Sequence, residues 1–191
     1  MNKGLVARCI LSLIQPSVYA VAGRLFVLTN GRAGSKLYKP NVNTFYETGL
    51  VTSLYEHLLM DPRLAHLEIR HEMPYPSGMG APERVDLWIR PPMGGYAHII
   101  EAGDYEPAKV HRDLAKAKRL NPRGSNWFLA FFRDPNAAVG PWSKVSTSFA
   151  RRNSGLDATQ CNTASRFCNG FTVYRPDGNS DQFGYALFRA V

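Results

Sequence analysis

Two strand-like segments joined by a Pro-Pro-Met-Gly-Gly turn constrain the fold of this chain most tightly. Residues 83–90 and 96–102 have the length and apolar content of strands, and the short turn between them predicts an antiparallel hairpin. Pairing about the Met-Gly step at the centre of the turn sets Asp86 opposite Glu101. Directly opposed residues point to the same face of a hairpin, with Cβ atoms about 5 Å apart. The sequence therefore predicts that these two carboxylates lie side by side.

This pair of acids needs a counter-charge. Two carboxylates placed directly opposite each other repel, which costs free energy and brings no structural benefit. A divalent cation removes the repulsion, and Mg²⁺ is commonly held in proteins by one or two carboxylates together with phosphate and water. Asp86 and Glu101 are therefore predicted to be metal ligands.

A third acid is predicted to face the core from a helix at residues 43–60. The helix is indicated by apolar residues at three- and four-residue spacing, which form one stripe: Leu50, Val51, Leu54, Tyr55, Leu58 and Leu59. Glu47 precedes Leu50 and Val51 by three and four positions, so it shares their inward stripe. A Glu on an apolar face needs a partner, which either a metal site or a basic residue on the sheet would supply. Glu47 is therefore the third candidate metal ligand.

The remaining patterns predict a single α/β domain with its core at residues 43–134. The chain has 191 residues, which is enough for one domain with a sizeable core. A further strand is expected at 66–73 and a second helix at 107–120. Residues 127–132 are a continuous apolar run, which suits a central strand that is covered on both faces.

Two flanking segments are expected to belong to the same domain. Residues 1–42 are predicted to pack on the core as a short helix, broken at Pro16 and Gly23, followed by a strand at 24–29. Residues 135–191 are predicted to form a polar, turn-rich loop and a C-terminal β-hairpin extension, with strands at 171–175 and 183–190.

The order of these elements resembles that of the PD-(D/E)xK, or restriction-endonuclease-like, nucleases. A helix with an inward Glu, a strand, a strand with Val-Asp-Leu, a hairpin turn, a strand with Ile-Ile-Glu, a helix and an apolar strand make an αβββαβ series over residues 43–133. The resemblance identifies Asp86 as the motif Asp, Glu101 as the motif Asp/Glu and Glu47 as the helix Glu. It implies a mixed central sheet flanked by helices, and hydrolysis of phosphodiester bonds, usually in DNA, with Mg²⁺ or Mn²⁺ as the cofactor.

The motif Lys is where this chain departs from the family. In the family it lies two residues after the Glu on the same strand face, and here that position is Gly103. Some relatives carry the Lys function on the following helix, which here offers Lys109, Arg112 and Lys116. Lys109 is nearest the end of the strand, so it is the predicted catalytic lysine. The alternative is that the helix lysines are ordinary solvated surface residues.

The net charge favours nucleic acid as a partner. Lys and Arg number 23 against 15 Asp and Glu, a formal charge of +8. The candidate nucleic-acid contacts are the basic residues near the predicted acid pair: Arg84, Arg112 and Lys116. The 3 Cys residues include no CxxC pair, which predicts neither a disulfide framework nor a structural zinc and fits a cytoplasmic protein. No stretch approaches the ~20 apolar residues of a membrane span, so no membrane partner is expected.

Three functions remain open on the sequence alone. The first is an active metal-dependent nuclease, in a phage or bacterial defence setting or a related one. The second is a catalytically impaired nuclease-like scaffold that binds nucleic acid or a protein as an inhibitor or regulator, which Gly103 would allow. The third is an unrelated α/β interaction domain, in which the acid pair faces basic residues such as Arg84 and a salt bridge replaces the metal.

Overall fold

The computed structural model describes residues 3–28, 42–75, 83–134, 161–163, 171–174 and 180–190, and within them seven strands form one mixed sheet. The strands follow the order β1 (Glu68–Tyr75), β2 (Glu83–Arg90), β3 (His98–Asp104), β4 (Ser125–Asp134), β7 (Ser180–Ala190) and β5 (Cys161–Thr163), and β6 (Phe171–Tyr174) also pairs with β7. β3 and β4 are parallel because α3 (Pro107–Leu120) crosses between them, and every other pairing is antiparallel.

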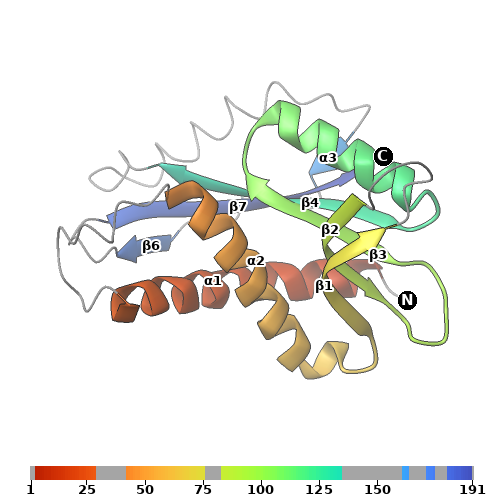
Figure 1. Ribbon diagram of the computed structural model, residues 1–191, viewed down its shortest axis with the longest axis horizontal. Coiled ribbons are helices and arrows are strands. Elements are labelled where there is room, and N and C mark those ends of the chain that lie inside the picture. Colours follow the sequence, from red (N-terminus) through yellow and green to blue (C-terminus); the bar gives the residue numbers. More distant parts are fainter. Residues whose placement is uncertain are drawn as a thin grey trace.

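Helices cover both faces of the sheet (Figure 1). α1 (Lys3–Leu28) and α2 (Val42–Met60), followed by the short 3-10 turn η2 (Pro62–Leu64), lie on one side, and α3 lies on the other. Alternate strand residues, such as Leu87, Ile100 and Leu129, pack with α1 and α2 in the main hydrophobic cluster. Trp88 and Ile99 point the other way and join a smaller cluster with Ala117 of α3.

The predicted α/β class with a mixed sheet is confirmed, and several predicted elements are found at their expected places. The strand at 83–90 and the helix at 107–120 have the predicted bounds, and the helix expected at 43–60 begins one residue earlier. In β4 every residue from 125 to 131 is buried, as expected for a strand covered on both faces. The strand expected at 66–73 is β1, which begins and ends two residues later.

The strand predicted at residues 24–29 is wrong, because α1 continues as one helix from Lys3 to Leu28 through Pro16. Its buried residues recur at helical spacing on both sides of the proline: Val6, Cys9, Ile10, Ile14, Val18 and Val21. This continuous stripe packs on α2, and the burial outweighs the one hydrogen bond that Pro16 removes. None of the described helices, α1 included, is both long and apolar enough to cross a membrane.

The predicted C-terminal hairpin exists, but it is not an appendage to the sheet. β6 and β7 pair as expected, and β7 also pairs with β4 from Trp127↔Arg189 to Asp134↔Gln182. Leu187 and Phe188 of β7 are fully buried. β7 is therefore a strand of the central sheet, and the short β5 beside it lies in a region where only turns were predicted.

Candidate functional site

Asp86 and Glu101 meet where the backbone pairing of β2 with β3 ends. The register Leu87↔Ile100, Trp88↔Ile99 and Ile89↔His98, continued by one residue, sets Asp86 opposite Glu101, as predicted. Beyond that point the Ala102 N–H donates to Asp86 Oδ2 at 2.7 Å. The Asp86 carboxylate thus accepts a hydrogen bond that a strand carbonyl would take if the ladder continued.

Burial makes this acid pair costly to ionise. Glu101 is 4% exposed, and its burial together with the charge of Asp86 raises its pKa to about 8. Burial also raises the pKa of Asp86, an effect partly offset by the hydrogen bond from Ala102. Any cation that settles on these oxygens relieves both desolvation and repulsion.

Lys116 supplies such a cation from α3. Its Nζ lies 2.7 Å from Glu101 Oε1 and donates to the carbonyl oxygen of Arg84 at 3.1 Å. The side chain of Lys116 is 26% exposed and that of Glu101 is 5% exposed, so this ion pair is largely shielded from solvent. Lys116 is predicted from the sequence to contact nucleic acid, and in the structure its ammonium group is paired with Glu101 and with the Arg84 carbonyl oxygen.

Lys109 and Glu47 meet over Gly103. Lys109 Nζ donates to Glu47 Oε1 at 2.8 Å, so α3 and α2 are joined across the end of β3. A Cβ at position 103 would overlap the amine of Lys109 and lie 3.2 Å from Glu47 Oε1. Gly103, which has no side chain, leaves room for this ion pair, and Lys109 fills the space that a strand side chain would occupy.

The three predicted acids do not form one metal-binding cluster. Across the described part of the chain, no group of three or more His, Cys, Asp or Glu side chains gathers closely enough to hold a metal ion. Glu47 is partnered by Lys109, and only Asp86 and Glu101 remain together. Two adjacent carboxylates still fit a hard cation such as Mg²⁺, which takes its other ligands from water and phosphate.

The two predicted arginine contacts lie near the site and remain open to solvent. Arg84 pairs with Glu72 at 3.6 Å, and its side chain is 67% exposed. Arg112 pairs with Asp113 at 3.1 Å, and its side chain is 71% exposed. Both guanidinium groups are thus accessible to a phosphate.

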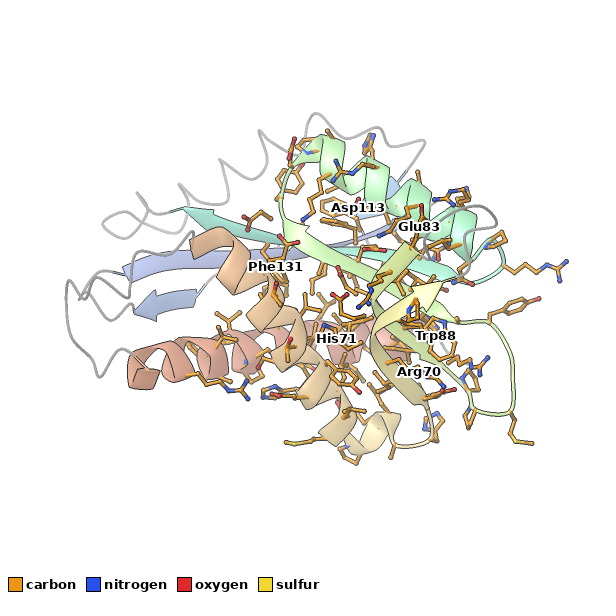
Figure 2. The ribbon with its side chains drawn as sticks, in the orientation of Figure 1. Arg70, His71, Glu83, Trp88, Asp113 and Phe131 are labelled. Atoms are coloured by element: carbon orange, nitrogen blue, oxygen red, sulfur yellow. The ribbon has the colours of Figure 1, made fainter. Side chains whose placement is uncertain are left out.

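Asp113 is an acid of the site that was not predicted. It is buried on the side of α3 that faces the strands (Figure 2), and its charge contributes to the raised pKa of Glu101. The sequence does contain a signal for it, because Asp113 falls on the same helical stripe as Val110, Leu114 and Ala117. An acid inside such a stripe needs a partner, as Glu47 does.

Glu72 is a second acid that was missed. The register His71↔Leu87 and Met73↔Val85 leaves Glu72 opposite Asp86, and its charge raises the pKa of Asp86. Its backbone has φ 52°, a conformation that non-glycine residues rarely adopt within a strand. Only the pairing of β1 with β2 brings Glu72 to this place.

No protein-family model matches the chain, and no curated protein and no solved structure matches it significantly.

Proposed function

We propose that this chain is a Mg²⁺- or Mn²⁺-dependent nuclease with a restriction-endonuclease-like core, and that it hydrolyses phosphodiester bonds in DNA. The observation that carries the proposal is the position of Lys109. In the family that the sequence resembles, a lysine follows the motif Glu by two residues, and here that residue is Gly103. Gly103 lies on β3, the strand that carries Glu101, and the amine of Lys109 occupies the space directly over it.

Each residue of the site has a separate role in the proposed reaction. Asp86 and Glu101 would hold the metal, which when bound polarises a phosphoryl oxygen and lowers the pKa of a bound water. Lys109 would hold its ammonium group where it can orient the attacking water or offset charge on the phosphate. Glu47 positions Lys109 through their 2.8 Å ion pair. The exposed guanidinium groups of Arg84 and Arg112 would bind the DNA backbone.

The test is cleavage of supercoiled plasmid and single-stranded DNA with Mg²⁺ or Mn²⁺. Asp86→Asn should abolish cleavage, because it removes a ligand. Lys109→Ala should lower the rate by roughly 10²–10³-fold, the usual loss when one donor that stabilises the transition state is removed. Gly103→Ala should also lower the rate, though by less, since its new methyl group would shift the end of the flexible Lys109 side chain.

The matched control is Lys118→Ala, which removes one charge from an exposed position on the same helix. This variant should cleave at the rate of the unmodified chain. Absence of cleavage by folded, unmodified protein with either metal would contradict the proposal, as would full activity in Asp86→Asn.

A specific observation favours a second candidate, a domain that binds nucleic acid or a protein without cleaving, either as an impaired nuclease-like scaffold or as an unrelated α/β interaction domain. The Lys116–Glu101 ion pair places an ammonium group on a proposed metal ligand, as expected if a salt bridge replaces the metal. In that case DNA binding, measured by fluorescence anisotropy in EDTA, would be retained in Asp86→Asn, and no metal would produce cleavage.

A further inference from the structure

The Lys116 ammonium is held by the kinds of atom that hold a divalent cation. Its two oxygen partners are the Glu101 carboxylate at 2.7 Å and the Arg84 carbonyl at 3.1 Å. Carboxylate and backbone carbonyl oxygens are both ordinary ligands of hard metal ions. Asp86, the other proposed ligand, is the strand neighbour of Glu101.

The sheet leaves this carbonyl available. Arg84 pairs with Pro74 of β1, and proline has no N–H to donate to it. The backbone pairing of β2 with β3 stops at Leu87, three residues before this carbonyl. Lys116 is thus the donor that the structure provides for a carbonyl at the edge of the site.

A second ion pair keeps this end of α3 against β2. Both oxygens of the Glu83 carboxylate accept from Arg119 Nη2, at 2.8 and 2.7 Å, and Glu83 lies beside α3 (Figure 2). Arg119 follows Lys116 by three positions and so shares its face of the helix. The Lys116 amine is therefore presented to Glu101 by a helix that is anchored on both sides of the contact: Lys109 holds Glu47, and Arg119 holds Glu83.

We propose that Lys116 is a resident counter-ion of the site, which a divalent metal must displace from Glu101 in order to bind. This inference rests on the proposed function, because it concerns the same pair of carboxylates. Asp86 and Glu101 carry two formal negative charges when ionised, and Lys116 balances one of them. With Lys116 bound the site therefore keeps a net negative charge, and a divalent metal ion added beside the ammonium group would make the site net positive. The metal ion and the ammonium group would repel each other at contact distance, because both are positively charged. The flexible stem of Lys116 allows its amine to leave while α3 stays in place.

The experiment measures the affinity of the full chain for Mn²⁺ without nucleic acid, by the electron paramagnetic resonance of free Mn²⁺. Lys116→Met should bind Mn²⁺ roughly tenfold more tightly than the unmodified chain, or more, in the range typical of coupled binding. Lys116→Gln keeps a donor for the Arg84 carbonyl but carries no charge, and it should show the same gain in affinity. It also serves as a second variant in case Lys116→Met does not fold. Lys118→Met removes an equal charge from an exposed position and should leave the affinity nearly unchanged.

A double variant, Lys116→Met with Asp86→Asn, separates this inference from the proposed function. It should lose the gain in affinity, because the proposed ligand pair is broken. Equal Mn²⁺ affinity in the unmodified chain and both Lys116 variants, with loss in Asp86→Asn, would overturn the counter-ion role and leave the metal site standing. If Asp86→Asn changes Mn²⁺ binding in none of these backgrounds, the metal site itself is refuted, and the inference with it.

Discussion

Gly103 has a positive role in this molecule, because its missing side chain leaves room for two others. The amine of Lys109 and the carboxylate of Glu47 meet over it, and any Cβ there would overlap the amine. In the sequence, Gly103 is recognisable only as the absence of an expected lysine. The structure adds that the vacated space is filled by a lysine from the next helix, which is the residue that the position along α3 favours.

Glu101 makes the stability of the metal-free protein depend on pH. Folding raises its pKa from 4.5 to about 8, mainly through burial and then through the charge of Asp86. Between these values the folded chain binds the proton more tightly than the unfolded chain does. The contribution of this proton to the free energy of unfolding is therefore fully present below about pH 4.5 and is lost as the pH rises through about 8.

Glu101→Gln should remove this dependence. Between about pH 5.5 and about pH 9 the variant should lose less free energy of unfolding than the unmodified chain, by at least about 1.4 kcal/mol, the equivalent of one pKa unit. Urea unfolding in EDTA at the two pH values measures the difference. Glu106→Gln, at an exposed carboxylate that makes no side-chain capping hydrogen bond, should behave like the unmodified chain. Parallel pH profiles for all three proteins would refute the assignment.

At the scale of elements, α1 shows how a buried stripe can outweigh a local helix breaker. Pro16 is exposed, and its buried neighbours Ile14, Ser17 and Val18 keep the helical spacing past it. The proline still cannot donate to the carbonyl of Ser12, and its ring crowds that carbonyl. The helix therefore carries a local cost that packing against α2 offsets.

Pro16→Ala should stabilise the protein by about 1 to 3 kcal/mol, because alanine restores the hydrogen bond and has the highest helix propensity. Urea unfolding at neutral pH measures the gain. Gln15→Ala, at an exposed neighbouring position without a breaker, should change the free energy of unfolding by less than about 0.5 kcal/mol. A destabilised Pro16→Ala variant would show that the proline is required by the packing of α1.

At the scale of the whole molecule, the C-terminal strand completes the core. Phe128 of β4 and Phe188 of β7 are paired across the two strands, and both are fully buried. Phe188 also stacks on Tyr105 at 5.9 Å, in the segment between β3 and α3. Residues from the end of the chain thus stabilise the element that carries Glu101.

Phe188→Ala should cost about 3 to 5 kcal/mol, as much as Phe128→Ala, with a single cooperative unfolding transition in both variants. Thermal and urea unfolding, followed by circular dichroism and by tryptophan fluorescence, measure the cost and the cooperativity. Met93→Ala, at a side chain that is 98% exposed, should be nearly neutral. A second transition in Phe188→Ala, with the rest of the fold intact, would make the C-terminal strands an independent unit.

Much of the fold and half of the candidate site could be predicted from local pattern. The hairpin register that opposes Asp86 and Glu101 follows from the turn, since a tight turn leaves two strands few ways to pair. The bounds of β2 and α3 follow from alternation, helical spacing and a proline at the first helical position. Contacts between residues close in sequence are governed by short-range rules of this kind.

The sequence by itself determined the α/β class, the central strand and the pairing of the two carboxylates, because period and turn chemistry act over a few residues. Only the tertiary structure decided which cation each acid receives: Lys109 for Glu47 and Lys116 for Glu101. It also decided the place of β7 in the sheet and of Glu72 opposite Asp86. These contacts join elements that lie far apart along the chain, and side-chain charge alone does not specify a partner among many. The packing of α2 and α3 on opposite faces of one strand is what specifies which cation each acid meets.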